Sequence, residues 1–354
     1  MNVHIVTQTF PPRIGGMQSL MYSIAKGLQS ESKKVVVYPD HKYKSEDSFN
    51  LSFFPSIKIL RPFFKKLLVR KNAEINDVAI CDTWKSVNAV PKNITKIICF
   101  AIGQEFLKSK NNKNIRKIQK AFDRCKYIVS ITKFTENLML SKCFVDKNKL
   151  KIIYPPFSVR PPIIKNKRLK DSTLKLISIC RIEDRKGLLE AAKALIIIHK
   201  ILPNFKWHIV GEGPSKQLLK KTIEKSSLIH NVIFEGFVSE EKKQELLSES
   251  SLFIMPGYMA KKSIEGFGIV YTEAASYGVP SVGGVDGGAS EAVINNKTGW
   301  CVNPKNTKKL TEVLSEAITN DVLRNKYGNE AKIFYKKSFS SSIAFDRLNK
   351  LVIN

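Results

Sequence analysis

The chain has 354 residues, 43% of them hydrophobic, so it is long enough for two compact domains with separate cores. Its 59 Lys and Arg outnumber 31 Asp and Glu, and a net charge of +28 favours anionic partners such as nucleic acid or an acidic membrane face. No uncharged run approaches the roughly 20 residues of a membrane span, and the start lacks a signal-peptide pattern, which argues against an integral membrane or secreted protein.

The six cysteines are scattered, without a Cys-x-x-Cys pair or a histidine at metal-ligand spacing. We therefore expect reduced, mostly buried thiols in a cytoplasmic protein that is soluble or peripheral. No metal site is expected.

Short apolar runs alternate with helical stretches along the whole chain, a pattern typical of parallel sheets covered by helices on both faces. The first series of predicted strands is Val3–Val6, Lys34–Tyr38, Asp77–Cys81, Lys96–Ala101, Tyr127–Ile131 and Lys151–Tyr154. The second series is Leu174–Cys180, Trp207–Val210, Val232–Phe234, Leu252–Met255, Val279–Val282 and Gly299–Val302. Between them lies a segment rich in proline and charge. We predict a first domain over residues 1–157, a linker over 158–172 and a second domain over 173–339.

Gly15 and Gly16 follow the first strand and precede a predicted helix over Gln18–Leu28. Glycines at this position permit the backbone to approach a ligand closely, although a plain strand-to-helix turn uses the same residues.

Two basic segments of the first domain have the composition of membrane contacts. Residues 61–71 interleave five cations with five large apolar residues, and residues 108–126 carry eight cations and one acid. In the second segment Ile115, Ile118 and Phe122 recur at helical spacing, which predicts an amphipathic helix. The alternative is an ordinary helix whose apolar stripe faces the core. The predicted membrane-docking residues are Arg61, Lys65, Lys66, Arg70, Lys71, Arg116, Lys117 and Lys120.

The most informative segment runs from Glu265 to Pro280. Glu265 precedes a Gly-Phe-Gly turn, and Glu273 lies eight positions later on a predicted helix. Eight helical residues rise about 12 Å, more than the roughly 5 to 9.5 Å between the paired carboxylates of a glycoside hydrolase. The two carboxylates are better placed to bind both ends of an extended ligand whose phosphates lie at the helix start, such as a nucleotide sugar. The alternative is a capped surface helix with two solvated glutamates.

This segment resembles the signature of the family four retaining glycosyltransferases, in which Glu, seven residues and Glu mark the donor site. The resemblance covers most of the chain and is strongest after Lys175. It implies the GT-B fold, in which two doubly wound Rossmann-like domains face each other across a cleft. It also implies that a C-terminal helix at about 340–354 packs back on the first domain.

The resemblance further implies the roles of individual residues. Arg181 and Lys186 match the family's basic residues that hold the donor diphosphate, and Glu265 matches the residue that binds the sugar. These three are the predicted catalytic residues. A solvated basic loop is the alternative for Arg181 and Lys186. The predicted donor-binding residues are Gly15, Gly16, Gly103, Gly211, Phe237, Val238, Gly266, Phe267, Gly268, Ile269 and Glu273, the last on the ribose.

One departure concerns the sugar. The family usually has histidine immediately before the glycine at position 103, and this chain has Ile102, so the donor sugar is left open. Metal-dependent transferases hold the diphosphate through an Asp-x-Asp pair, and this sequence has none.

We therefore expect a retaining, metal-independent glycosyltransferase that needs no cofactor and uses a nucleotide sugar, with a UDP-sugar favoured. Its acceptor is expected to be a lipid or a lipid-linked saccharide at the inner face of the cell membrane, where the enzyme is peripheral. The alternatives are an enzyme with a soluble acceptor, another GT-B enzyme such as an epimerase or phosphorylase, and a basic nucleic-acid-binding protein. A nucleic-acid-binding protein would need aromatic platforms or a recognition helix among its basic residues, and neither is evident in this sequence. No nucleic-acid partner is therefore expected.

Overall fold

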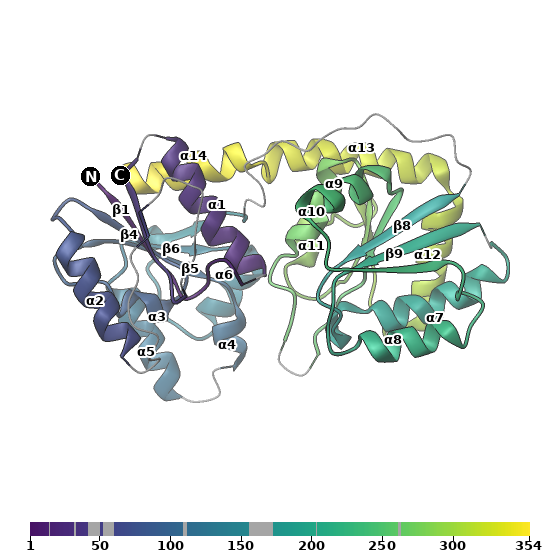
Figure 1. Cartoon of the computed structure of the whole chain (residues 1–354), viewed down its shortest axis with the longest axis horizontal. Coiled ribbons are helices and arrows are strands. Elements are labelled where there is room, and N and C mark those ends of the chain that lie inside the picture. Colours follow the sequence, from purple (N-terminus) through teal and green to yellow (C-terminus); the bar gives the residue numbers. More distant parts are fainter. Residues whose placement is uncertain are drawn as a thin grey trace. The chain divides into compact units, whose positions relative to one another are not determined.

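The computed structural model describes residues 1–13, 15–31, 33–41, 50–51, 60–108, 112–155, 173–202, 204–260 and 263–354. The chain folds into two compact units, one of Met1–Val159 with Phe339–Asn354 and the other of Arg160–Ser338. Each unit is built on a parallel sheet with helices packed on it (Figure 1). This architecture confirms the predicted α/β fold class of two doubly wound units.

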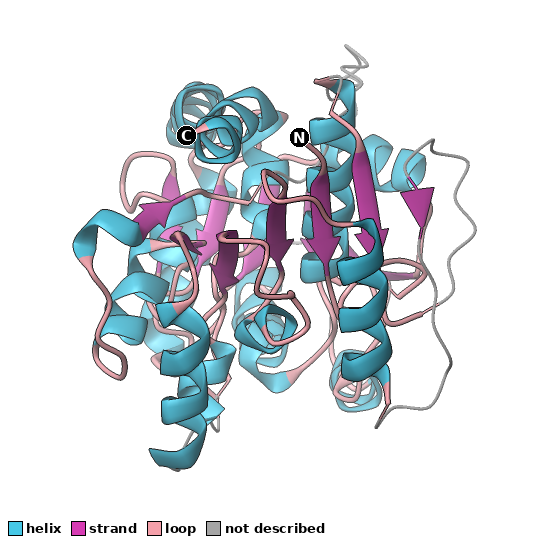
Figure 2. Ribbon diagram, turned by 90° about the vertical axis from the view of Figure 1, so that its left-hand side faces the viewer, coloured by secondary structure: helices cyan, strands magenta, loops and turns pink. Residues whose placement is uncertain are grey.

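The first unit is a seven-stranded sheet of order β3-β2-β1-β4-β5-β6-β7, which Figure 2 shows between two layers of helices. Its strands are β1 Val3–Val6, β2 Val35–Tyr38, β3 Asn50–Leu51, β4 Val78–Cys81, β5 Lys96–Ala101, β6 Tyr127–Ser130 and β7 Leu150–Ile152. Its helices are α1 Gly16–Ser30, α2 Arg61–Asn72, α3 Trp84–Val87, α4 Gln104–Lys108, α5 Asn112–Asp123, α6 Lys133–Leu140, the 3₁₀ turn Lys147–Lys149 and α14 Ser341–Ile353.

The central strands form because their sequences are short apolar runs rather than alternating ones. Every residue of β1, β2 and β4 is buried, as expected of parallel strands covered on both faces. β1 pairs with β2 through Val3 and Val35, and with β4 through Val3 and Val78. The two-residue edge strand β3 is too short to give a sequence pattern, which is why the sequence does not predict it.

The C-terminal helix α14 packs on the first unit. A Cβ atom at Gly27 of α1 would lie only 2.3 Å from the ring of Phe345, so the absence of a side chain there lets the two helices meet. At the start of α14, Phe339 makes an edge contact with Tyr154 at 4.9 Å between ring centroids. Near its end, Lys96 Nζ donates to the Val352 carbonyl at 2.6 Å. The final residues therefore complete the first unit rather than the second.

The second unit is a six-stranded sheet of order β10-β9-β8-β11-β12-β13. Its strands are β8 Leu174–Ile179, β9 Phe205–Val210, β10 Val232–Gly236, β11 Leu252–Met255, β12 Ser281–Gly283 and β13 Gly299–Cys301. Its helices are the 3₁₀ turn Asp184–Lys186, α7 Leu188–His199, α8 Lys216–Glu224, α9 Glu240–Glu249, α10 Ile269–Ser276, α11 Ala289–Ala292, α12 Thr307–Thr319 and α13 Asp321–Ser338.

Two buried tryptophans anchor the core of the second unit. Trp207 and Trp300 are almost fully excluded from solvent, and each satisfies its indole N–H. The N–H of Trp207 donates to Ser178 Oγ at 2.9 Å, and that of Trp300 donates to Glu316 Oε2 at 2.7 Å. The sheet is thereby tied to α12 through Trp300.

The six cysteines are free thiols, four of them buried. Within the described ranges, no helix combines the length and the apolar character that crossing a membrane requires.

Candidate functional site

The predicted site residues of the second unit lie on loops at the carboxyl edge of its sheet. From β8 the chain adds β9 and β10 on one side, and it then returns to place β11 on the other side of β8. The loop after β8 and the loop after β11 therefore flank the point where the direction of winding changes. Ligands of open α/β sheets bind at such a switch point.

Gly268 begins α10 in a conformation that other residues rarely adopt. Its φ is 81°, and a Cβ atom there would lie 2.5 Å from the ring of Tyr271. No side chain at Gly268 caps the helix, and the first amide groups of a helix have no partner within it. This geometry suits the binding of an anion at the start of α10, the position for which the sequence predicts donor contacts from Gly266, Phe267, Gly268 and Ile269.

Glu265 lies between two cations from the loop after β8. Its Oε2 accepts hydrogen bonds from Lys186 Nζ and from Arg185 Nη1, the latter at 3.2 Å. Burial raises the pKa of Glu265, but Lys186 and Arg185 lower it by more, so its pKa lies below the ordinary value. Glu265 is thus a carboxylate fixed by two cations. The structure joins two residues, Glu265 and Lys186, that the sequence predicts to act together.

Arg181 is placed differently from Lys186. Its side chain is 72% exposed, and its Nε pairs with Glu183 Oε1 at 3.1 Å. The other oxygen of Glu183 pairs with Arg185 Nε at 3.0 Å. Arg185, which the sequence prediction does not include, therefore occupies the position beside Glu265. The signal for it is present in the sequence, because Arg185 is a second cation directly before Lys186.

Glu273 is also buried, and it has a different partner. Its Oε1 accepts from Lys243 Nζ of α9 at 2.8 Å. Burial raises the pKa of Glu273, and Lys243 opposes that rise only in part. The sequence prediction includes Glu273 but not Lys243, because the two lie 30 positions apart and no local pattern connects them.

Gly211 allows three strand ends to approach one another. Its φ is 120°, a Cβ atom there would lie 2.1 Å from the Cys180 carbonyl oxygen, and its N–H donates to Gly236 O at 2.7 Å. The next predicted residues, Phe237 and Val238, follow β10 at the same edge of the sheet, and the Phe237 ring is 70% exposed. The sheet thus brings the loops after β8, β9, β10 and β11 to one edge.

In the first unit, the predicted glycines lie at the carboxyl edge of the other sheet. Gly15 and Gly16 lie between β1 and α1, and Gly103 follows β5 with a φ of 94°. Glu105 Oε1 accepts from the N–H of Ile102 at 3.0 Å, which fixes the turn that contains Gly103. Burial raises the pKa of Glu105 to about 7.

A buried carboxylate, Asp82, organises the start of the loop that leads to Gly15. Asp82 follows β4, and its Oδ2 accepts from the hydroxyl of Thr7 at 2.9 Å and from the amides of Gln8 at 2.8 Å and Thr9 at 3.1 Å. Its Oδ1 accepts from Ser86 Oγ at 2.6 Å. The sequence prediction omits Asp82, because a single aspartate after a strand has no distinctive spacing.

Comparison with known proteins decides the class. The model of the family described as glycosyl transferases group 1 matches residues 159–334, which include every predicted site residue of the second unit. The chain belongs to the group 1 glycosyltransferases. It is therefore an enzyme, and the resemblance seen in the sequence is confirmed.

Relatives of this glycosyltransferase span most of its length. A GDP-mannose-dependent monoacylated alpha-(1-6)-phosphatidylinositol monomannoside mannosyltransferase of Corynebacterium glutamicum is 26% identical, over 98% of this chain and 97% of the relative. A GDP-mannose-dependent alpha-(1-6)-phosphatidylinositol monomannoside mannosyltransferase of Mycobacterium tuberculosis is 25% identical, over 89% of each chain.

Solved structures confirm the GT-B fold of the enzyme. The HepE protein of Anabaena, crystallised with UDP, superimposes with a TM-score of 0.80 at 17% identity, over 99% of each chain. Sucrose-phosphate synthase of Thermosynechococcus elongatus superimposes with a TM-score of 0.81 at 14% identity, over 99% of this chain and 98% of that one.

The two basic segments of the glycosyltransferase differ in which side chains they expose. On α2, Lys65 faces inward: it is 3% exposed, pairs with Asp40 Oδ1 at 2.5 Å and donates to the Thr7 carbonyl at 2.8 Å. The assignment of Lys65 to a membrane-docking surface is therefore wrong, because its charge is satisfied inside the unit. The outward face of α2 instead carries apolar side chains among its remaining cations. Leu60, Phe63 and Leu67 are 43%, 61% and 45% exposed, beside the exposed Lys66, Arg70 and Lys71.

On α5 the apolar stripe faces the core. Ile118 and Phe122 are buried, and Ile115 packs against the same cluster. The exposed side chains are cations, among them Arg116, Lys117 and Lys120. The ordinary amphipathic interpretation is thus correct for the stripe, and the exposed face of this helix is mainly cationic.

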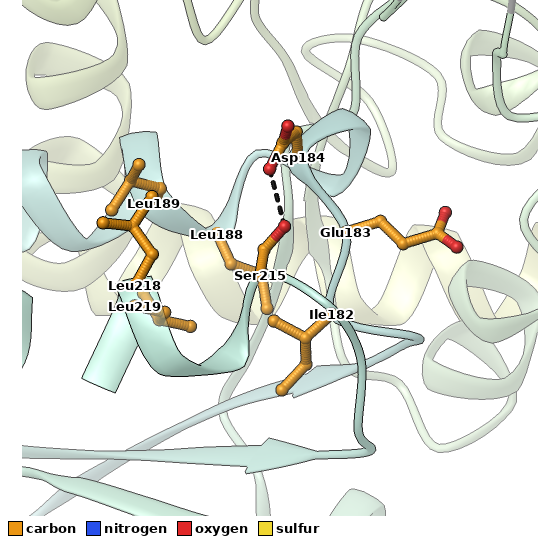
Figure 3. A pocket seen from close by; sticks show the side chains of 8 residues that line it. All are labelled: Ile182, Glu183, Asp184, Leu188, Leu189, Ser215, Leu218 and Leu219. Carbon is orange, nitrogen blue, oxygen red and sulfur yellow. Dashed lines mark hydrogen bonds between the residues drawn. The ribbon is translucent and has the colours of Figure 1, made fainter. Parts of the chain in front are cut away.

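A shallow hollow, open to solvent, lies beside α7 and α8 in the second unit. Figure 3 shows its largely leucine and isoleucine lining, with Ser215 Oγ donating to Asp184 Oδ1 at 2.6 Å. None of the predicted site residues lines it, although Glu183, which pairs with Arg181 and Arg185, does.

In the part of the chain that the structure describes, no three His, Cys, Asp or Glu side chains are grouped as metal ligands.

Proposed function

We propose that this glycosyltransferase is a retaining, metal-independent enzyme that transfers a sugar from a nucleotide-sugar donor to a lipid or a lipid-linked saccharide. The observation that carries the proposal is the cluster of Glu265, Lys186 and Arg185 at the switch point, next to the uncapped start of α10. Departure of a nucleoside diphosphate builds negative charge on phosphate oxygens, which fixed cations and helix amides stabilise.

In this proposal, different residues of the chain bind different parts of the donor. Lys186 and the start of α10 bind the diphosphate, together with Arg181, whose exposed side chain is available to a ligand. Glu265 accepts hydrogen bonds from sugar hydroxyls, and Glu273 accepts them from the ribose. The bond between the sugar and the phosphate breaks, the acceptor oxygen bonds to the sugar on the face that the phosphate leaves, and the leaving phosphate oxygen takes the acceptor proton. The anomeric configuration is then retained without an enzymatic base.

Two kinds of donor are considered, GDP-mannose and UDP-sugars. The relatives that span most of the chain are named as GDP-mannose-dependent, which favours GDP-mannose over the UDP-sugar that the sequence interpretation favours. Ile102 stands where the family usually has histidine, a difference that bears on the choice of sugar and not on the base. GDP-mannose and UDP-sugars are therefore tested side by side.

The acceptor is proposed to lie in an anionic membrane, with α2 as the docking element. Its outward face combines Leu60, Phe63 and Leu67 with three exposed cations, an arrangement that suits the boundary between lipid headgroups and acyl chains. Each cation near an anionic leaflet contributes about 1 kcal/mol, and the cations of α5 add to the same attraction. The enzyme would act as a peripheral protein at the inner face of the cell membrane.

The reaction is tested by incubating the enzyme with GDP-mannose, a panel of UDP-sugars and a lipid extract, followed by mass spectrometry of the lipids. The proposal predicts a glycolipid with the anomeric configuration of the donor, assigned by NMR. An inverted anomer, release of free sugar alone, or transfer only to water-soluble acceptors would contradict it.

Docking is tested by co-sedimentation with vesicles of neutral and anionic lipid. The double variant F63D/L67D and the triple variant K66E/R70E/K71E are each expected to lose binding to anionic vesicles. Val322 on α13 is 81% exposed, so V322D is a matched control for placing an aspartate on an apolar surface position. Binding of all variants equal to that of the parent would show that α2 is an ordinary solvated helix.

A further inference from the structure

Helix α9 contributes a lysine to the site at Glu273. Lys243 Nζ lies 2.8 Å from Glu273 Oε1 and 2.9 Å from Glu240 Oε2. Glu240 and Lys243 are three positions apart on α9, whereas Glu273 comes from α10. Lys243 thus links α9 to α10 through Glu273, and Glu240 contacts it from its own helix.

The three groups differ in their exposure to solvent. The side chains of Lys243 and Glu273 are 18% and 9% exposed, and that of Glu240 is 54% exposed. Burial lowers the pKa of Lys243, but the two carboxylates raise it by more, so Lys243 is a cation throughout the physiological range. Tyr335 of α13 also interacts with Glu273, and burial and the Glu273 charge raise the pKa of Tyr335 to about 12. Lys243 is therefore the cation that compensates the charge of Glu273.

A buried carboxylate that must accept hydrogen bonds from a ligand has two requirements. It must be ionised, and its plane must be fixed before the ligand arrives. Lys243 acts on both requirements, because its charge favours the ionised form against the effect of burial and its hydrogen bond holds the carboxylate at Oε1. Glu240 in turn restrains Lys243 from the first turn of α9.

We propose that Lys243 is a positioning residue of the donor site, which orients the Glu273 carboxylate toward the ribose hydroxyls of the nucleotide. The inference rests on the proposed function, in which Glu273 binds the ribose. It adds a connection that the sequence does not reveal. The chain enters α9 directly after Phe237 and Val238, so Lys243 ties the segment predicted to border the base to the glutamate predicted to bind the ribose.

The test measures nucleotide binding by calorimetry, with UDP and GDP as probes and no acceptor present. K243M removes the charge at similar side-chain length, K243R keeps the charge, and E273Q removes the carboxylate. K242M is the matched control, because Lys242 is the neighbouring lysine of α9, is exposed, and pairs with Glu245 of the same helix. Thermal unfolding of each variant verifies that the second unit is folded.

The preferred nucleotide is expected to bind about tenfold more weakly to K243M at pH 7, the scale of one charge-assisted hydrogen bond, and K243R is expected to restore most of the loss. Without the cation, the pKa of Glu273 rises further, so the affinity of K243M should recover as the pH is raised above 7. The double variant K243M/E273Q should bind no more weakly than E273Q, because Lys243 acts through Glu273.

Two results would overturn the inference while leaving the donor site in place: K243M binding nucleotide like the parent, or its loss adding in full to that of E273Q. If E273Q itself binds nucleotide like the parent, the assignment of Glu273 to the ribose fails, and the proposed function loses that contact. K242M is expected to match the parent in every case.

Discussion

Replacing Lys186 with methionine separates its structural role, the ion pair with Glu265, from its proposed role in catalysis. Lys186 is 8% exposed and donates to Glu265, which also accepts from Arg185 at 3.2 Å. In the proposed reaction Lys186 stabilises the leaving diphosphate. The variant keeps the length of the side chain and removes only the charge.

The effect on turnover is expected to be large and the effect on stability small. Loss of one preorganised electrostatic group lowers turnover about 100- to 1,000-fold, or about 2.7 to 4 kcal/mol. Breaking a buried ion pair costs about 3 to 5 kcal/mol when it leaves one charge alone. Arg185 still compensates Glu265 in K186M, so the loss of unfolding free energy should be smaller, about 1 to 2 kcal/mol.

The assay follows release of nucleoside diphosphate from the preferred donor in the presence of lipid extract, with unfolding measured in parallel. Lys193 is an exposed lysine on α7, so K193M is the control for a lysine-to-methionine change in the same unit. Turnover of K186M within about threefold of the parent, with the fold intact, would refute the electrostatic role. A loss shared by K193M would point to a general effect of reduced charge.

Three further predictions concern metal, backbone and pH. A chelator such as EDTA should leave activity unchanged, measured as nucleoside diphosphate release; complete loss that manganese restores would contradict a metal-independent mechanism. Gly268→Ala should destabilise the enzyme by about 1 to 3 kcal/mol in urea unfolding and weaken nucleotide binding, because φ is 81° and the new Cβ would meet the Tyr271 ring; unchanged values would mean that the turn has another conformation. Burial raises the pKa of Glu105 from 4.5 to about 7, so the folded protein holds this proton to higher pH than the unfolded chain and loses stability as pH rises between those values. E105Q should lack that part of the pH dependence. Equal slopes of unfolding free energy against pH in E105Q and the parent would disprove the contribution of Glu105.

The sequence determines the local features of this enzyme. Apolar runs such as those at β1, β4 and β8 predict buried parallel strands, because strands covered on both faces need no alternation. The glycine turn before Ile269 predicts a helix start with unpaired amides, and the structure has α10 begin at that residue. Each of these features depends on neighbours within a few positions.

Partnerships between distant residues were decided only by the tertiary structure. The sequence contains Arg181, Arg185 and Lys186 within six positions, but the turn after β8 directs Arg185 and Lys186 to Glu265 and leaves Arg181 exposed. The partnership of Lys243 with Glu273 likewise depends on where α9 and α10 lie on the second sheet.

The orientation of the two basic helices was also decided by the tertiary structure. Helical spacing predicts an apolar stripe on α5 but not the direction in which it points, and packing against the first sheet buries it. On α2 packing buries Lys65 and leaves Phe63 and Leu67 outside. The physical reason is that periodicity fixes which side chains share a face of a helix, whereas the elements packed around the helix fix which face meets water.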